Sequence, residues 1–141
     1  MKTKKHAIQL VDFKTVEITF KARNSSAFSD EVDSTEFSLM TGHSPFNKDS
    51  SSINVMAKAV IGELDDFPLY ICVDVRGTFV VDTELFDVQY IESWAKRNAP
   101  YILYPYLREH VHSISCRVGL KGMMLPLLEV PTFKISPVSV S

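Results

Sequence analysis

The stretch that decides the expected fold is PYILYPYLREHVHSISCRV, residues 100–118. It opens with Pro100, whose fixed φ suits the first turn of a helix. Apolar residues then recur at spacings of three and four, which is one face of an α-helix: Leu103, Leu107, Val111, Ile114 and Val118. The spacing predicts a helix over residues 100–118, bent in its first turns by Pro105 and ended by Gly119.

Upstream of this helix, four segments alternate between apolar and polar residues. The alternation predicts strands over residues 7–23, 36–41, 52–63 and 67–81. The last two are joined by a short polar link around Asp65, which predicts an antiparallel hairpin.

Two irregularities are expected within these strands. In the first strand, Val11 and Phe13 have the opposite parity to Val16, so we expect a bulge near Lys14–Thr15. In the fourth strand, a bulge is expected at Gly77.

A second, shorter helix is predicted between the last strand and the long helix. Asp82 or Thr83 can cap it, and it covers residues 84–97. Its apolar side is Leu85, Val88, Ile91, Trp94 and Ala95. Four strands followed by helices predict an α+β fold, in which a four-stranded antiparallel sheet has helices packed on one face. The length predicts a single domain over residues 1–141. The chain after Gly119 is expected to be extended and partly apolar.

Composition limits the class of protein. The chain is 45% hydrophobic and 23% charged, with a net charge of -2, so nothing favours binding to nucleic acid. The basic start has no apolar run after it, so we expect no signal peptide, and without an 18-residue apolar run we expect no insertion into a membrane. Two cysteines, Cys72 and Cys116, do not make a disulfide scaffold. We therefore expect a cytoplasmic protein with reduced thiols.

Catalytic and metal-binding patterns are missing from the sequence. His110 and His112 are two residues apart on a helix and point to different sides. Neither cysteine has a spacing that supports a metal site or a Cys–His nucleophile, and there is no Gly-rich phosphate loop. We expect no enzyme, no cofactor and no metal; a small-molecule binding protein or enzyme on an α+β scaffold is the weakest alternative.

Apolar side chains are unusually frequent in and beside the irregular segments. They include Phe28, Phe37, Leu39, Met40, Phe46, Met123, Met124, Leu125, Leu127, Leu128 and Phe133. Methionine and aromatic residues suit a surface that accepts different partners. They equally suit a core or a subunit interface, and the sequence leaves both interpretations open.

The long helix also carries a resemblance to a known family. The run APYILYPYLRE, residues 99–109, is similar to the helix signature of the SecB family of export chaperones. The segment GMMLPLLEVPTF, residues 122–133, resembles the run that follows in that family, and Gly77 and Phe79 resemble its Gly-x-Phe at the end of the last strand. The matches follow one another in the family's order over roughly residues 70–133.

The resemblance implies a function and several sites. SecB-like proteins are tetrameric, ATP-independent holdases without a cofactor, which bind unfolded or nascent chains in apolar grooves. By resemblance, the groove residues here are Phe37, Leu39, Met40, Leu125, Leu127 and Phe133. The subunit interface is Tyr101, Tyr104, Arg108 and Val111. Glu17 matches an acidic position of the face that binds the translocase motor SecA.

Two departures from the family shape the prediction. The chain has Pro137 and β-branched residues where the family has a second long helix, and Lys21 stands where a second acid is usual for SecA. A holdase for protein export and a dedicated chaperone for one client, such as an antitoxin, both fit the sequence. The main alternative is a non-chaperone oligomeric interaction protein on the same fold, whose apolar surface is used up by assembly.

Overall fold

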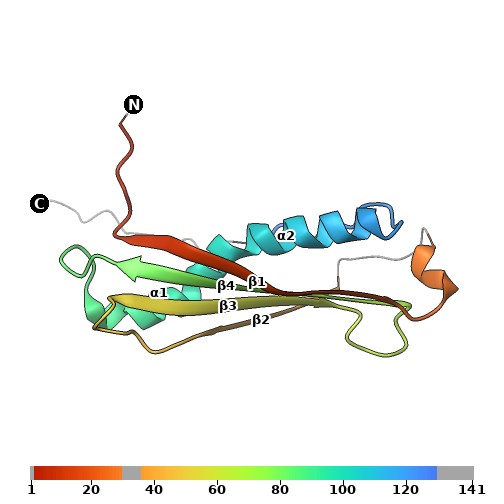
Figure 1. Ribbon diagram of the computed structural model, residues 1–141, viewed down its shortest axis with the longest axis horizontal. Coiled ribbons are helices and arrows are strands. Elements are labelled where there is room, and N and C mark those ends of the chain that lie inside the picture. Colours follow the sequence, from red (N-terminus) through yellow and green to blue (C-terminus); the bar gives the residue numbers. More distant parts are fainter. Residues whose placement is uncertain (1, 30–35, 130–141) are drawn as a thin grey trace, which may run out of the picture.

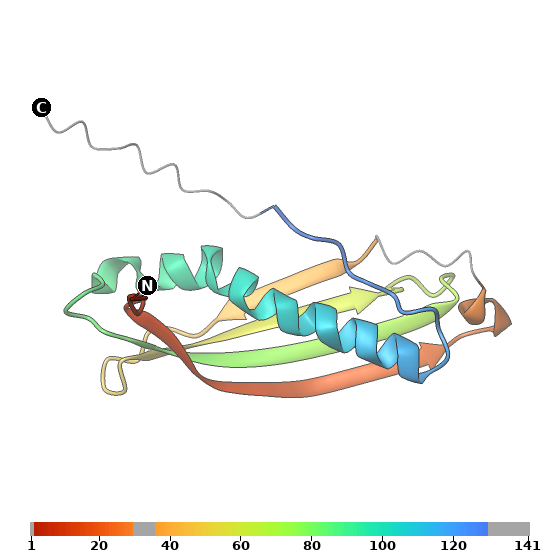
Figure 2. The ribbon, with the colours of Figure 1, turned by 90° about the horizontal axis from the view of Figure 1, so that it is seen from above.

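The computed structural model describes residues 2–29 and 36–129, which form a four-stranded antiparallel sheet with helices on one face. The strands are β1 (Ile8–Ala22), β2 (Ser38–His43), β3 (Ser52–Ile61) and β4 (Leu69–Val81), in the order β1-β4-β3-β2. The helices are α1 (Ile91–Arg97) and α2 (Ala99–Arg117), with short 3-10 turns η1 (Ser25–Phe28) and η2 (Val88–Tyr90). Both views show α2 lying across the same side of the sheet (Figures 1 and 2). The predicted fold class is confirmed.

The hairpin of β3 and β4 forms the centre of the sheet, as predicted. The odd-numbered residues of both strands face the helices and are buried: Ile53, Val55, Ala57, Ala59, Ile61, Leu69, Ile71, Val73, Val75 and Phe79. Period-two alternation in these two strands thus supplies most of the buried residues on the sheet side of the core. We call this side of the sheet the helix side and the other the open face.

Strand β1 carries two register shifts against β4, of which one was predicted. The shift between Thr15 and Glu17 lies at the expected bulge. A second shift lies between Leu10 and Asp12. Val11 and Val16 are the extra residues, and both are exposed. The two bulges place Leu10, Phe13 and Phe20 on the helix side, although their sequence parity differs.

Helix α2 follows its predicted boundaries within one residue. Leu103, Leu107 and Val111 are fully buried against the sheet, and the helix continues through Pro105. Gly119 takes a φ of 95° immediately after it. An apolar stripe at helical spacing is thus sufficient to place this element.

Gly77 corrects one expectation. β4 runs through it in continuous register with Val55 of β3, so it is not a bulge. A Cβ atom here would lie 2.9 Å from Leu10 Cδ1 and 3.0 Å from Leu103 Cδ2. The missing side chain of Gly77 therefore leaves the space that Leu103 of α2 and Leu10 of β1 fill.

We expect a Gly77→Val variant to lose about 1–3 kcal/mol of unfolding free energy, the usual cost of overpacking. The isopropyl group must displace Leu10 and Leu103 from the core. Urea unfolding measures the loss. An unchanged midpoint would contradict the tight contact between α2 and β4.

The first helix is shorter than predicted. Helical hydrogen bonding begins only at Ile91, because the chain before it makes separate turns. Asp82 accepts a hydrogen bond from the amide of Glu84, and Asp87 accepts one from the amide of Gln89. Leu85 and Val88, predicted on the apolar side, are exposed, whereas Ile91 and Ala95 are buried as expected.

Candidate functional site

The segment after α2 turns back and runs beside that helix, on its β2 side (Figure 2). We call residues 120–129 the strap. It contains no regular helix or strand, as the sequence predicted. Ser115 fixes its first half: the carbonyl of Ser115 accepts from the amide of Leu120, and its hydroxyl accepts from the amide of Met123, both at 2.8 Å.

The second half of the strap is held by two side chains of α2. The Tyr104 hydroxyl donates to the carbonyl oxygen of Pro126, and Arg108 Nε donates to that of Leu125 at 2.9 Å. Tyr104 and Arg108 are four residues apart, so they project from one face of the helix. Between these bonds, the Leu125 side chain enters the core and is 0% exposed.

Phe37, just before β2, completes this region. Its ring stacks on Tyr104 with centroids 6.2 Å apart and planes at 30°. Leu39 lies two residues further on, also on the helix side, and both are partly buried against the core. We call the surface formed by Phe37, Leu39, Tyr104 and Arg108, on which the strap lies, the helix-side surface.

The predicted groove residues therefore do not all lie together. Phe37 and Leu39 belong to the helix-side surface, and Leu125 is buried where the strap lies on it. Leu127 follows on the strap and is 81% exposed. Met40 pairs with Lys58 on the open face, 43% exposed, so its placement in one groove with Leu39 was wrong: adjacent strand residues point to opposite faces. Phe133 lies outside the described residues.

The four residues predicted at a subunit interface differ in how much surface they offer. Val111 is 0% exposed within the protomer core, so it has no surface to offer a second protomer. Tyr104 is occupied by Phe37 and the strap, and Arg108 by the strap. Tyr101 is half-buried. Two other apolar residues of α2 are exposed: Ile102 is 42% exposed, and Tyr106 is 39% exposed with its ring packed on Phe13 of β1, centroids 4.3 Å apart.

Burial raises the pKa of Tyr104 above its ordinary value of 10.0, and the nearby Arg108 lowers it by less. The hydroxyl therefore stays protonated and able to donate to Pro126 at neutral pH. Below about pH 10 the hydroxyl is protonated in both the folded and the unfolded chain, so its hydrogen bond contributes fully to the free energy of unfolding. Above that pH the unfolded chain ionises first, so stability falls until the folded-state pKa is passed.

We therefore expect urea stability to fall more steeply above pH 10 in the wild-type chain than in a Tyr104→Phe variant. The other tyrosines, including Tyr70 with its raised pKa, are common to both chains and cancel. Parallel curves between pH 8 and 11 would show that Tyr104 is not held as a buried donor.

The open face carries charged pairs that neutralise one another. Asp74 is only 6% exposed and accepts two hydrogen bonds from Arg76, at 2.9 and 3.0 Å. Glu17, the predicted acidic contact for SecA, lies opposite Asp74 on β1 and accepts from the hydroxyl of Thr19. Lys21 stands on the same strand, so the face is of mixed charge.

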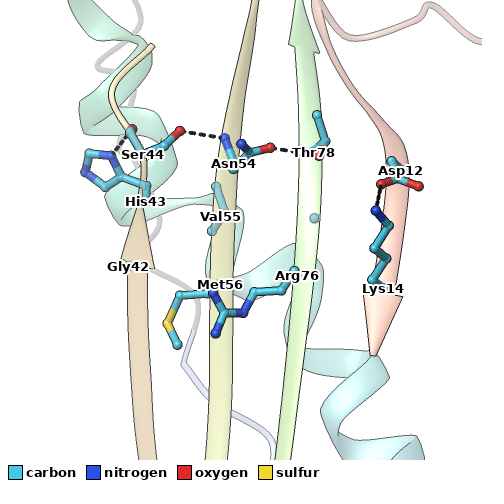
Figure 3. Close-up of a pocket in the computed structure, with 11 residues that line it drawn as sticks. Asp12, Lys14, Gly42, His43, Ser44, Asn54, Val55, Met56, Arg76 and Thr78 are labelled. Atoms are coloured by element: carbon cyan, nitrogen blue, oxygen red, sulfur yellow. Dashed lines mark hydrogen bonds and ion pairs between the residues drawn. The ribbon is translucent and has the colours of Figure 1, made fainter. Parts of the chain in front are cut away.

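A hollow of about 550 Å³ lies on this open face, between the ends of β1 and β2. Figure 3 shows Arg76 reaching across β3 toward Met56, with Asp12 and Lys14 at one side. Asn54 joins Thr78 and Ser44 across the floor of the hollow, at 2.8 and 3.0 Å. The polar side chains on the floor of the hollow are thus bonded to each other.

Among the cysteines and histidines, only Cys116 and His112 are in contact within the described residues. Cys72 is buried on β4, where burial raises the pKa of its thiol, and Cys116 is exposed with Sγ 3.9 Å from His112 Nε2. His110 instead meets the Thr15 hydroxyl at 3.0 Å, so the two histidines do point to different sides. Within residues 2–29 and 36–129, no three side chains of His, Cys, Asp or Glu gather as a metal site.

Sequence reasoning missed the hydrogen-bonding side chains that hold the strap. Tyr104, Arg108 and Ser115 lie on one side of α2 at spacings of four and seven, beside the apolar stripe. That spacing was readable from the sequence. Their partner was not, because the strap has no periodicity that says where it runs.

Comparisons with known proteins identify the fold. No model of a known protein family matches the sequence. An uncharacterized protein of Methanocaldococcus jannaschii is 33% identical over 76 residues, which cover 52% of this chain; the chain spans about half (48%) of the length of that curated relative.

Two solved structures resemble the fold. One is a SecB-like chaperone of Mycobacterium tuberculosis in complex with a ChAD peptide from the HigA1 antitoxin: TM-score 0.69, 15% identity, covering 89% of this chain and 94% of the other. The other is a protein of unknown function from Streptococcus agalactiae: TM-score 0.52, 12% identity, covering 85% and 97%. The fold is SecB-like.

Among the helices in the described part of the chain, none combines the length and the apolar character needed to cross a bilayer.

Proposed function

We propose that this protein is an ATP-independent chaperone that binds extended, apolar segments of client chains on the helix-side surface. One observation carries the proposal: this surface already holds an extended segment, the strap, through one buried side chain and two main-chain carbonyls. Such contacts depend little on sequence, which is what a protein that holds unfolded chains requires.

The physical basis is burial of apolar area. A client leucine or phenylalanine removed from water contributes roughly 1.5–3 kcal/mol, from which the cost of ordering the segment is subtracted. Aromatic rings such as Phe37 add contact area that tolerates different partners. Several weak contacts along one chain then give useful affinity without nucleotide hydrolysis.

A dedicated client is the form of the proposal that the observations favour. The fold is that of a chaperone bound to an antitoxin peptide. On the open face, where a SecA-binding role would need acidic side chains, Asp74 and Asp12 pair with Arg76 and Lys14, and Glu17, the one predicted acidic contact, accepts from Thr19. The proposal includes a cytoplasmic homotetramer without a cofactor, with the outward side of α2 in subunit contacts.

The test is suppression of aggregation. A reduced or denatured model protein is diluted into the chaperone without ATP, and light scattering is followed. We expect dose-dependent suppression near one tetramer per client. Trp94, packed edge-on against Phe79 with centroids 5.2 Å apart, provides a fluorescence signal for binding near α1. Unchanged scattering at several-fold excess would contradict general holdase activity.

A further inference from the structure

We infer that the strap is a resident ligand of the helix-side surface, and that clients bind there by displacing it. The inference rests on the proposed function and deepens it in two ways. It defines the chemical class of segment that the surface takes, and it gives the surface a built-in competitor.

The strap buries one side chain completely. Leu125 is 0% exposed, and Met123 and Leu128 are partly buried against the core. Met124 and Leu127 between them are 49% and 81% exposed. Buried and exposed residues that follow one another this closely are typical of an extended peptide lying on a surface, with its deepest contact at Leu125.

The two hydrogen bonds beside Leu125 go only to main-chain atoms of the strap. Tyr104 and Arg108 donate to the carbonyls of Pro126 and Leu125, and every residue type has a carbonyl there. Proline at position 126 has no N–H, so this site makes no demand for one. Strand addition to a sheet edge, by contrast, requires both donors and acceptors.

These contacts define the ligand. It is an extended segment with one leucine-sized apolar side chain, followed by a residue that tolerates proline. A client segment of this kind needs the same two donors and the same buried position as the strap. The strap and a client segment cannot make these contacts at the same time. The apparent affinity for client is therefore the intrinsic affinity multiplied by the fraction of molecules in which the strap is displaced.

The test uses a Leu125→Ala variant of the full chain. Removing the anchor weakens closure, so we expect unfolded client to bind about tenfold tighter or more than to wild type. A fluorescein-labelled peptide of residues 122–129 (GMMLPLLE) is expected to bind the variant in trans. The same peptide with aspartate at the position of Leu125 is expected not to bind.

The matched control is Leu85→Ala, the same substitution at a position that is 70% exposed and outside the helix-side surface. It is expected to bind client and peptide as wild type does. Far-UV circular dichroism checks that both variants fold. Equal or weaker client binding by a folded Leu125→Ala variant would overturn the inference.

A second measurement needs no substitution. The amides of Leu120 and Met123 are bonded to Ser115, so strap release exposes them to deuterium exchange. Saturating client or strap peptide is expected to reduce their protection in the wild-type chain. Unchanged or increased protection would overturn the inference even if the Leu125→Ala variant fails to fold.

The outcomes separate this inference from the proposed function. If the strap peptide binds the variant but neither chain holds an unfolded client, the strap is displaceable and the chaperone function is wrong. If wild type and variant hold client equally and the peptide does not bind, the function stands and the strap is a fixed part of the fold.

Discussion

A Phe37→Asp variant is expected to lose client binding by about tenfold or more, while a Met40→Asp variant, three residues further on in β2, keeps it. Phe37 stacks on Tyr104 and lies on the helix side, whereas Met40 lies on the open face. A carboxylate at position 37 would be desolvated by any bound apolar client without gaining a partner.

Aggregation suppression and peptide anisotropy measure this pair of variants. Both replace an apolar side chain in or next to β2 by the same charge, so general effects on solubility are matched. Thermal unfolding confirms that each is folded. Loss of binding in the Met40→Asp variant alone would move the client to the open face.

Gly62→Ala is expected to cost about 3 kcal/mol or more of unfolding free energy, and Gly119→Ala about 1–2 kcal/mol. Both glycines have positive φ, 77° and 95°. An added Cβ at Gly62 would lie 1.9 Å from the carbonyl oxygen of Leu69, so the backbone of the β3–β4 hairpin must move. At Gly119 no atom lies within 4 Å of the added Cβ, so the only cost is the backbone strain of an alanine at positive φ.

Urea denaturation measures both variants, and Gly119→Ala serves as the control for φ alone. The difference between the two is the cost of the clash. Equal losses would mean that the turn at Gly62 relaxes without disturbing the first residue of β4.

The parts of the fold that repeat regularly were predictable from sequence. The α2 stripe and the β3–β4 alternation are local patterns whose partners lie in the same element or the next one. Only one of the two bulges in β1 was predicted, because Val11 was expected to face the same side as Phe13. Valine suits either side of an edge strand, so its side could be settled only by pairing with β4.

The helix before α2 shows a second reason for error. Leu85 and Val88 continue the spacing of Ile91, but Asp82 and Asp87 bind nearby amides and divert the chain into turns. Local side-chain bonds of this kind compete with helix formation and are hard to weigh from spacing alone.

The candidate site was predicted in part. Phe37, Leu39 and Leu125 were identified by the apolar excess and the family resemblance, and the structure places them on one side of the sheet. Met40 was misplaced because the apolar run was grouped without applying strand parity. The bonds from Tyr104 and Arg108 to the strap could not be predicted, because they depend on a return path that no sequence pattern encodes.

The central claim, that clients bind on the helix side of β2, is tested most directly by photo-crosslinking from two adjacent residues. Thr41 and Met40 are both exposed but lie on opposite faces of the strand. With p-benzoylphenylalanine in place of Thr41, we expect irradiation to crosslink a bound unfolded client. The same group in place of Met40 is expected to give little or none, and a stronger crosslink from position 40 than from 41 would contradict the account.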